Sequence, residues 1–447
     1  MNAPLPIDRI VAEAKAPHGA PRRSDADRER ASEPDLPAPI SEPYLLVLFS
    51  VPFIVDAAGR RWIDALWAKD LAEHTRYIHR LILASPRRDG PAPAHAIALD
   101  ESPELAGITC VDLPAPAHLL SALALLPRTA AILWKAIGAA RFVHAGVAGW
   151  PIPEAWILVP LLALRKRPLY LNVESAFWRL VPGERPTLRR RLRAWLSEQL
   201  NRACMERCDF AMFTHEGYRG SLMPRHPERG HVGEASWIDD ADVLSPADAH
   251  AGAERRRHRA GPLRLVFAGR LTREKGVELL LNAAAQAAHA GAWFELDLFG
   301  DGPLAAACAE TIRTQGLAAS VRMRGTLPYG ASFFAALREF DALLVPTLSD
   351  EQPRIVFDAY AQGLPVVASR TDGLIQCVLD GVTGLLVSRD DVAAWRAAIV
   401  DLAARPAALA DMSLACVERA RGLTHEQMHR KRWRLLVERF PALTGAA

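Results

Sequence analysis

The residues best suited to chemistry fall in two segments of the second half of the chain. The first segment is 267–276, where Gly269 closes an apolar run and Arg270 and Lys275 follow before a helical pattern begins. Glycine lets a backbone approach a ligand closely, and two cations beside a helix N-terminus attract an anion such as phosphate. An ordinary strand-to-helix turn with solvated charges has the same composition. This segment alone therefore leaves both interpretations open.

The second segment, 346–369, carries two carboxylates around a predicted helix start. Asp350 lies in a polar loop, and Asp358 lies inside the helix predicted over 354–362. A helix N-terminus presents free backbone N–H groups and a partial positive charge, so a diphosphate fits there electrostatically. The two carboxylates can accept hydrogen bonds from sugar hydroxyls. The N–H groups predicted for this site belong to Arg354, Ile355 and Val356.

Two further glycine-rich segments are weak signals when taken alone. Residues 298–303 place two glycines after an apolar run, and 371–387 predicts turns around a short helix. Neither pattern indicates a particular ligand. No Asp-x-Asp pair, the motif that would bind a metal ion, stands at a suitable predicted strand end. Of the six cysteines, only Cys204 and Cys208 are close together, without the further ligands that a zinc site needs. We therefore expect no metal and no cofactor, and buried free thiols.

Alternating strands and helices hold these segments in place and predict an α/β fold. In the second half, the predicted strands are 263–270, 294–300, 321–325, 342–346, 365–370 and 384–388, and the helices are 277–290, 304–314, 331–339, 354–362, 392–404, 407–421 and 425–440. In the first half, the strands are 44–50, 81–84, 142–145, 169–173 and 210–214, and the helices are 62–80, 117–139, 153–164 and 187–202. Parallel sheets of this kind bind ligands at the carboxyl ends of their strands.

Composition divides the chain and limits its partners. We predict a disordered tail over 1–40, an N-terminal domain over 41–240, a linker over 241–262, a C-terminal domain over 263–420, and a last helical segment over 421–447 that packs back on the N-terminal domain. The net charge of +3 gives no reason to expect nucleic acid as a partner. No uninterrupted apolar run reaches the roughly 18 residues of a membrane-spanning helix. The tail lacks the apolar core of a signal peptide, so we expect a cytoplasmic protein that is soluble or peripheral to a membrane.

The order and spacing of these motifs resemble the donor half of retaining glycosyltransferase family 4, the group 1 glycosyl transferases. The similarity covers about 263–402 and rests on the glycine, arginine and lysine of 269–276, on Gly-Asp-Gly-Pro at 300–303, on the two acids, and on the glycine-bearing segments 363–369 and 380–387. It implies the GT-B fold, in which two Rossmann-like doubly wound domains face an interdomain cleft. It also implies transfer of a sugar from a nucleoside-diphosphate sugar, with retention of configuration and without a metal.

The resemblance implies a role for each matching residue. Arg270 and Lys275 would clamp the donor phosphates and neutralise the departing diphosphate. Asp358 would hold the ribose hydroxyls, and Asp350 would contact the transferred sugar. The remaining donor contacts would come from Gly269, Gly302, Gly325 and Leu327.

This sequence departs from the family at both acids. The family usually has glutamate at each position, whereas Asp350 and Asp358 are one methylene shorter. Either the helix lies closer to the donor or the contact is weaker. Glu351, one position further along, is an alternative to Asp350.

The first half matches the family poorly. The glycine-rich loop common after the first strand is missing, and Ser-Val-Pro-Phe-Ile-Val-Asp stands at 50–56 instead. His144 resembles a histidine that the family often has, although a histidine satisfied at a strand end is an equal alternative. Where many members have a later histidine, this chain has Glu174, which with Trp178 and Arg179 would line the acceptor side of the cleft.

Basic and apolar residues gather in the first half. Arg165, Lys166 and Arg167, and the arginines of 189–193 with Trp195, accompany an apolar segment at 119–137. One interpretation is a core helix with a solvated face, and the other is peripheral docking on anionic lipid.

We expect a hexosyltransferase that acts on a saccharide or a polyprenyl-linked saccharide in bacterial exopolysaccharide biosynthesis. Two alternatives remain: a catalytically weak GT-B scaffold or partner protein, suggested by the two aspartates, and a nucleotide-sugar epimerase.

Overall fold

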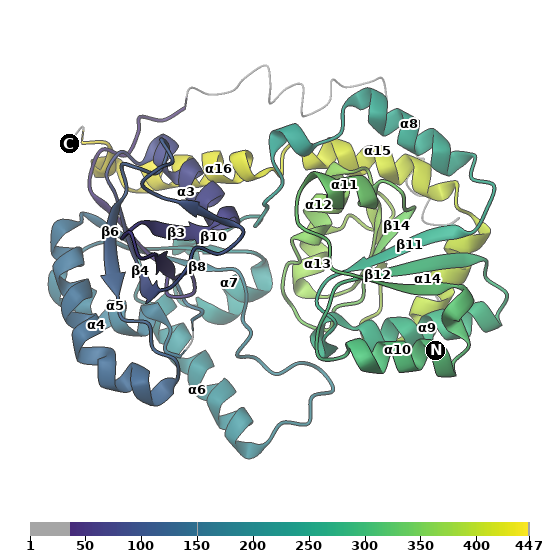
Figure 1. Cartoon of the computed structure of the whole chain (residues 1–447), viewed down its shortest axis with the longest axis horizontal. Coiled ribbons are helices and arrows are strands. Elements are labelled where there is room, and N and C mark those ends of the chain that lie inside the picture. Colours follow the sequence, from purple (N-terminus) through teal and green to yellow (C-terminus); the bar gives the residue numbers. More distant parts are fainter. Residues whose placement is uncertain (1–35, 150, 446–447) are drawn as a thin grey trace. The chain divides into compact units, whose positions relative to one another are not determined.

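The computed structural model describes residues 36–149 and 151–445, which form two compact units (Figure 1). Of the described residues, one unit contains 181–183 and 234–427, and the other contains 36–149, 151–180, 184–233 and 428–445. Residues 1–35 of the predicted tail lie outside the described part. The last residue of that prediction, Ile40, is fully buried and donates its N–H to Tyr77 O at 2.7 Å, so the ordered chain begins before residue 41.

The unit formed by 234–427 is built on a sheet in which every strand pairs in parallel. The order is β13-β12-β11-β14-β15-β16, which is the order 3-2-1-4-5-6 of a Rossmann-type domain. All of the predicted strands are present, and their bounds are β11 (Leu263–Ala268), β12 (Phe294–Phe299), β13 (Val321–Gly325), β14 (Ala342–Val345), β15 (Val366–Ser369) and β16 (Gly384–Val387). β14 and β15 are buried along their whole length because helices cover both sides, whereas the edge strand β13 is mostly exposed and carries Arg322 and Arg324.

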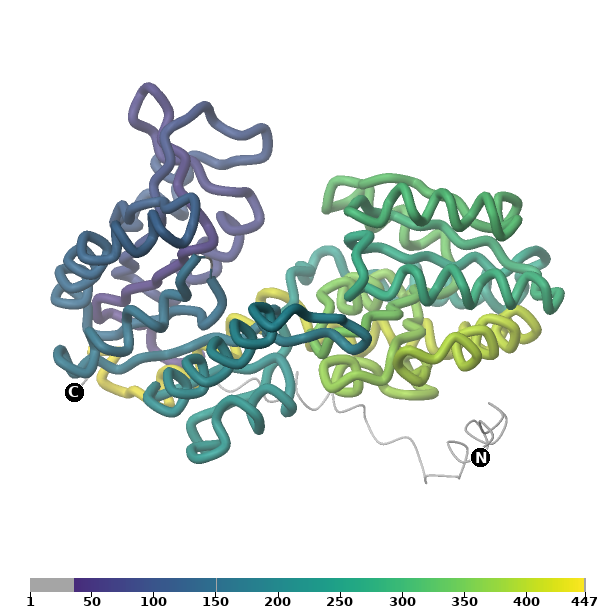
Figure 2. Tube along the Cα trace, turned by 90° about the horizontal axis from the view of Figure 1, so that it is seen from below, coloured from purple at the N-terminus to yellow at the C-terminus, as the bar shows by residue number. Residues whose placement is uncertain are grey.

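Helices form two layers on this sheet, and the connections place the ligand edge at its carboxyl ends. One core joins the sheet to α9, α10 and α14, and a second core joins its other face to α11, α12 and α15. The helix bounds are α9 (Val277–His289), α10 (Ala305–Thr314), α11 (Ala331–Leu337), α12 (Ile355–Ala361), α13 (Asp372–Cys377), α14 (Val392–Ala404) and α15 (Ala408–Ala420). Figure 2 follows the chain through these layers, with α15 in yellow-green.

The predicted linker, 241–262, is wrong for most of its length. Residues Pro246–Arg257 form α8, which packs along α15 (Figure 1). Ser245 caps the helix by accepting from Asp248 N, and Arg256 is buried and donates to Ser413 Oγ and Phe340 O at 3.0 Å each. The charge of this run of arginines had suggested a solvated linker. One of its members, Arg256, is instead a core residue.

The other unit has a larger mixed sheet with the order β10-β9-β8-β7-β1-β4-β2-β3-β5, and β6 pairs with β4. Pairing is parallel from β10 to β2 and antiparallel where β3 joins β2 and β5. The strand bounds are β1 (Tyr44–Val47), β2 (Phe53–Val55), β3 (Arg61–Asp64), β4 (Leu81–Asp89), β5 (Ala96–Ala98), β6 (Thr109–Leu113), β7 (Phe142–Gly146), β8 (Leu169–Val173), β9 (Phe210–Phe213) and β10 (Gly230–Val232). The sequence did not predict β2, β3, β5, β6 or β10.

Helices cover both faces of this sheet as well. The helices α4 (Leu119–Ala139), α5 (Glu154–Arg165), α6 (Leu188–Met205) and α7 (Glu216–Leu222) pack on one face. The helices α3 (Ala65–Tyr77) and α16 (His425–Arg439) pack on the other, and residues 428–445 of the C-terminal segment belong to this unit.

Among the described residues, α4 is long and apolar enough to cross a membrane by length and composition, with 28% of its apolar window buried. The sequence prediction overlooked it because Arg128 and Lys135 interrupt the apolar run.

Candidate functional site

Three loops stack at the carboxyl edge of β13, β12 and β11, and glycine makes the stacking possible. Gly269 donates its N–H to Phe299 O at 3.0 Å, and Gly300 donates to Gly325 O at 2.7 Å. Gly300 has a φ of +140°, and a Cβ at this position would lie 1.9 Å from Gly269 O. The backbones of these loops are therefore closely packed against one another. A ligand would have to bind beyond them, outside the carboxyl edge of the sheet.

A fourth loop, after β14, is tied to the loop after β11. Leu348 N and Thr347 Oγ1 both donate to Glu274 O, at 2.8 and 2.9 Å. Gly276 starts α9 with a φ of +72°, and a Cβ there would lie 1.8 Å from Pro346 O. The two segments that the sequence singled out are thus adjacent, because β11 and β14 are neighbouring strands.

Lys275 lies at the junction of these two loops. Its Nζ forms an ion pair with Glu351 Oε1, and both side chains are about one-fifth exposed. Arg270 is 73% exposed, with its guanidinium 3.8 Å from Glu274 Oε1. The loop therefore presents one partly buried cation and one exposed cation at a strand end, where a diphosphate would meet both.

The two acids that follow β14 have different partners. Asp350 accepts a hydrogen bond of 2.7 Å from Arg389 Nη1, whereas Glu351 pairs with Lys275. A Cβ at Gly373 would lie 2.3 Å from Glu351 O, so α13 closes against the same loop. Glu351 therefore contacts the predicted phosphate clamp, and Asp350 occupies a separate, more exposed position. Arg389 was not identified from the sequence, because nothing marks it apart from its place just after β16.

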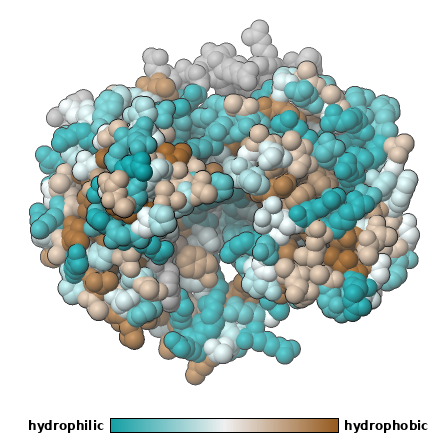
Figure 3. Space-filling view, viewed as in Figure 1, coloured by the Kyte–Doolittle hydropathy of each residue, from teal (hydrophilic) through white to brown (hydrophobic). Residues whose placement is uncertain are grey.

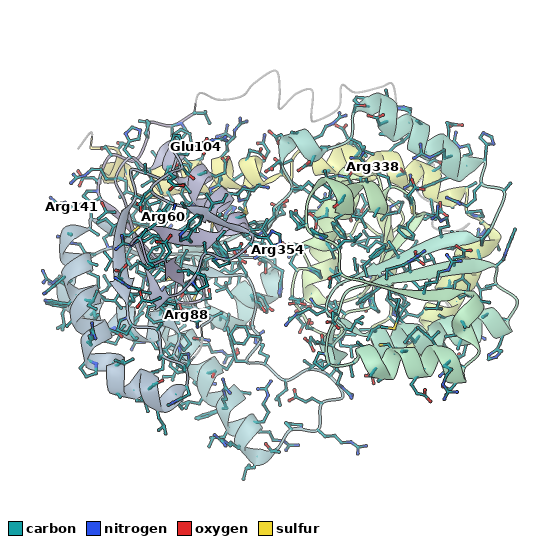
Figure 4. The ribbon with its side chains drawn as sticks, in the orientation of Figure 1. Arg60, Arg88, Glu104, Arg141, Arg338 and Arg354 are labelled. Atoms are coloured by element: carbon teal, nitrogen blue, oxygen red, sulfur yellow. The ribbon has the colours of Figure 1, made fainter. Side chains whose placement is uncertain are left out.

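The N-terminus of α12 is less suited to binding a diphosphate than the sequence suggested. The helix α12 has only seven residues, and Val356 donates its N–H to Pro353 O at 3.2 Å, so this group is not free for a ligand. Ile355 begins the helix. Arg354, labelled in Figure 4, is exposed, and its guanidinium lies 4.6 Å from the centroid of the Trp237 ring. Positive charge at this end comes from Arg354 more than from the dipole of so short a helix.

Asp358 is buried, with 4% of its surface exposed, and Tyr329 donates to its Oδ1 at 2.8 Å. Burial and the neighbouring Asp358 carboxylate raise the pKa of the Tyr329 hydroxyl, so it remains a donor at neutral pH. The sequence did not indicate Tyr329, although it stands two positions after Leu327, one of the predicted donor contacts. The structure thus places a hydroxyl beside the acid that is predicted to bind the ribose.

The other predicted donor residues lie on the same edge of the sheet. Gly302 has a φ of +159° in the loop after β12, and Gly325 ends β13 with a φ of +70°. Leu327 is 38% exposed and follows that strand. An exposed apolar side chain beside a glycine suits a flat base.

His144 belongs to the core of the other unit, which argues against its predicted catalytic role. It lies in the middle of β7, 5% exposed, and stacks on Tyr170 with ring centroids 4.0 Å apart. Burial, with a contribution from Arg432, lowers the pKa of His144 well below its usual value. A ring in this position is neutral and packed between aromatic neighbours, so the alternative of a core histidine is favoured.

Glu174 follows β8 at the carboxyl edge and is partly buried, as a site residue should be. Its Oε1 accepts from Asn172 Nδ2 at 3.1 Å. The two residues predicted to accompany it serve another purpose, since Trp178 Nε1 and Arg179 Nη2 donate to the Glu198 carboxylate at 2.8 and 2.7 Å. Those contacts fix the start of the 177–187 segment against α6.

Glu154 is a buried acid at the same edge that the sequence analysis missed. It begins α5, is 3% exposed, and accepts from Gly146 N at 3.2 Å through Oε1. Burial raises the pKa of Glu154 to about 7. Its Oε2 has no hydrogen-bond partner among the described residues.

One group of described residues could offer three ligand atoms to a metal ion: Asp70, His74 and His429. Each is engaged by its neighbours. His429 Nε2 lies 3.0 Å from Asp70 Oδ1, and Arg432 Nη1 lies 3.2 Å from His74 Nε2. A guanidinium at hydrogen-bond distance from a ligand nitrogen opposes a second cation there, so we interpret the group as a hydrogen-bonded network that joins α3 to α16.

The six cysteines are free, and all but Cys110 are buried. Burial raises the pKa of Cys204 and Cys377 to about 12, which keeps both as thiols at neutral pH.

Comparison with known proteins identifies the unit that carries these loops. A family model described as "Glycosyl transferases group 1" matches residues 262–405. The chain is 31% identical over 197 residues to D-inositol 3-phosphate glycosyltransferase of Arthrobacter sp. (strain FB24), covering 43% of this chain and 46% of that protein. It is 30% identical over 153 residues to glycogen synthase of Mycobacterium tuberculosis, covering 34% and 37%. The matches thus span less than half the length of these relatives.

Solved structures share the two-unit architecture over most of the chain. The sucrose-phosphate synthase of Thermosynechococcus elongatus matches with a TM-score of 0.63 and 19% identity, covering 90% of this chain and 100% of that one. Anabaena HepE, solved in complex with UDP and glucose, matches with a TM-score of 0.61 and 15% identity, covering 89% and 99%. The fold is therefore GT-B, with two Rossmann-like domains, as the sequence predicted.

Proposed function

Residues 262–405 belong to the group 1 glycosyl transferases, and from this premise we propose that the protein transfers a sugar from a nucleoside-diphosphate sugar to a saccharide or lipid-linked saccharide. The observation that carries the proposal is the junction of the β11–α9 and β14–α12 loops at the carboxyl edge of the sheet. There Lys275, Glu351 and the Glu274 carbonyl hold two segments together. A cation fixed in this way can stabilise negative charge that develops on a leaving diphosphate.

Each side chain of the donor site has a proposed task. Lys275 and Arg270 bind the diphosphate, and the partly buried Lys275 holds the position that a leaving group requires. Asp358, with the hydroxyl of Tyr329, recognises the ribose. Asp350, oriented by Arg389 at 2.7 Å, contacts the transferred sugar.

We further propose that the reaction retains the anomeric configuration, as the family resemblance implies. The acceptor hydroxyl would attack on the face that the nucleotide leaves, and the departing phosphate would take its proton. This scheme needs charge at Lys275 and Arg270 and calls on no metal. It is compatible with exopolysaccharide synthesis by a cytoplasmic enzyme.

The test measures sugar transfer in the wild-type protein and two variants. A thermal-shift screen over nucleotide sugars first identifies the donor. Lys275→Ala should then lower kcat by about 10²- to 10³-fold, the cost of removing one preorganised charge from a leaving group. Arg273→Ala is the matched control, because this exposed arginine of the same loop donates to Gly183 O and has no proposed role in catalysis.

The outcomes separate the candidate functions. Nuclear magnetic resonance of the product should show the anomeric configuration of the donor, and inversion would contradict the retaining mechanism. A nucleotide sugar that binds but is not transferred, with Lys275→Ala indistinguishable from wild type in turnover, would instead favour a scaffold that binds a donor. Conversion of the donor into an isomer without an acceptor would favour an epimerase.

A further inference from the structure

Helices α4, α5 and α6 lie side by side on one face of the mixed sheet, and the outer surface of α6 exposes large apolar side chains among arginines. The contacts run from α4 to α5 and from α5 to α6, and all three helices bury apolar residues against the sheet. On the solvent side, large apolar side chains remain exposed, and they are Leu188 (83%), Leu192 (61%), Trp195 (59%), Leu196 (46%) and Leu200 (37%). Isolated exposed leucines are ordinary, but a contiguous set on one helix marks an interaction surface.

Helical spacing places these side chains on one face. The leucines at 188, 192, 196 and 200 recur every four residues, whereas the buried residues Ala194 and Asn201 lie on the opposite side. An ordinary surface helix turns its polar face to solvent. The core-facing side of α6 buries Ala194, Asn201, Cys204 and Met205, whereas the outward side holds the four leucines and Trp195, so burial in this fold does not explain the outward apolar residues.

The first turns of α4 add to the same surface. Leu119, Leu120 and Leu123 are 44%, 74% and 50% exposed. In a parallel βα arrangement each helix runs opposite to the strands, so the N-termini of α4 and α6 both lie at the carboxyl edge of the sheet. Figure 3 shows hydrophobic side chains, in brown, at the lower left, over the ends of α4 and α6 drawn there in Figure 1.

The charge of this layer has one sign. The three helices contain two carboxylates, of which Glu154 is buried and Glu198 is paired with Arg179. The basic residues in the same helices are Arg128, Lys135, Arg165, Arg189, Arg190, Arg191, Arg193 and Arg202. Of these, Arg190 pairs with Glu184 and Arg202 pairs with Glu198, and Arg189, Arg191 and Arg193 are exposed.

We propose that the outward face of α6 and the N-terminal turns of α4 dock on the anionic surface of a lipid bilayer. Leucines and a tryptophan beside exposed arginines are suited to the boundary between acyl chains and phosphate headgroups. A second copy of the chain fits less well, because a two-fold contact would place arginine-rich faces against each other.

Docking would serve the proposed transferase by position. The carboxyl edge of this sheet is where a ligand of such a domain binds, and the exposed leucines of the first turns of α4 and α6 lie toward that edge. A sugar acceptor anchored in the bilayer would therefore meet the enzyme where its headgroup leaves the membrane. This consequence rests on the proposed function, whereas the docking itself does not.

Co-flotation of the full-length protein with vesicles tests the proposal without donor or acceptor. Vesicles containing phosphatidylglycerol should carry the protein, and vesicles of phosphatidylcholine alone should carry at least tenfold less. Arg189→Glu with Arg193→Glu should weaken binding by more than tenfold, because each arginine near an anionic surface contributes about fivefold. Leu192→Ser with Trp195→Ser should abolish the part of the binding that survives high salt.

The chain supplies matched controls for both kinds of variant. Trp293 is 66% exposed and Arg255 is exposed, and both belong to the other unit, so Trp293→Ser and Arg255→Glu should bind vesicles like the wild type. Binding that ignores anionic lipid, or α6 variants that match these controls, would overturn the proposal. So would an α6 variant that loses a dimer in size-exclusion chromatography while wild-type vesicle binding is absent. None of these results would alter transfer to a soluble acceptor, so the two proposals fail separately.

Discussion

The two sheets hold their carboxyl edges by different means. In the 234–427 unit, backbone groups of neighbouring loops hydrogen-bond to each other directly, as Gly300 N and Gly325 O do. In the other unit, side chains hold the edge. Glu154 accepts from Gly146 N, and Glu198 ties Trp178 and Arg179 to α6.

This difference explains why the loops at the carboxyl edge of the 234–427 unit could be recognised from the sequence more readily than those of the other unit. Close backbone contact demands glycine at fixed positions, so the constraint is visible in the residue types themselves. A carboxylate that stabilises a loop can be replaced by many other arrangements, and no spacing reveals it. The glycine positions of the first edge are therefore visible in the sequence, whereas the carboxylates that hold the other edge carry no such mark.

The largest effect should come from a side chain introduced where the β11–α9 and β14–α12 loops are in contact. In Gly276→Ala, the new Cβ would overlap Pro346 O and the φ of +72° would be strained. We expect a loss of about 3 to 5 kcal/mol in the free energy of unfolding. Gly291→Ala is the control, because Gly291 has a φ of +83° with nothing within 4 Å, and should lose only about 1 kcal/mol. Equal losses in chemical denaturation would show that backbone contact is not what constrains this edge.

The side-chain network of the other unit should be nearly as costly to break. Asp70 is buried and faces both His74 and His429. Asp70→Ala leaves buried donors without an acceptor and should cost about 3 kcal/mol, measured by the denaturant midpoint. Asp411→Ala, which removes an exposed partner of Arg257, should change stability by no more than about 0.5 kcal/mol. A small effect of Asp70→Ala would mean that this network is dispensable.

Glu154 should make stability depend on pH. Burial raises the pKa of Glu154 to about 7 in the folded protein, so the folded state keeps a proton that the unfolded state releases above the ordinary pKa of 4.5. The stability that the protonated Glu154 contributes to the folded state is fully present below pH 4.5 and is lost as pH rises through 7. Glu154→Gln, which can still accept from Gly146 N, should therefore be more stable than wild type at pH 8 by about 2 kcal/mol and similar at pH 4. Parallel curves of stability against pH would contradict the burial of a neutral carboxyl.

Tyr329→Phe should have the smallest effect of the four. It removes the hydroxyl that donates to Asp358 at 2.8 Å. Loss of one hydrogen bond to a charged acceptor weakens binding by about 1 kcal/mol, or roughly fivefold, and we expect this in the nucleotide dissociation constant by calorimetry. Asp358→Asn keeps an acceptor for the hydroxyl but removes the charge, so it separates the two contributions. Unchanged affinity in Tyr329→Phe would place the ribose away from this pair.

Much of the fold could be predicted from the sequence. Most of the strands between 263 and 388 are largely buried and read as apolar runs, and the more exposed β13 was predicted as well. In the other unit, β2, β3 and β5 are short and partly exposed, and all three take part in antiparallel pairs, so no apolar run marked them. The arginine-rich sequence of α8 concealed a helix whose Arg256 is satisfied in the core.

The site was predictable only where motifs are local. Gly269, Lys275 and Asp358 follow strands whose order fixes their neighbourhood. Tyr329 and Arg389 contact the predicted acids from other elements, and only tertiary structure brings such pairs together. His144 had the right residue type, but it lies in the middle of β7, where its ring is buried against Tyr170.

The bonds from Leu348 N and Thr347 Oγ1 to Glu274 O limit how the proposed donor specificity can change. The segment that would distinguish one sugar from another is joined to the segment that would grip the diphosphate common to all donors. A substitution that shifts the 347–351 loop to admit a new sugar would move Lys275 with it. Altered specificity would then be accompanied by weaker binding of every nucleotide, and laboratory evolution toward a new donor should need a second substitution near Glu274 to restore it.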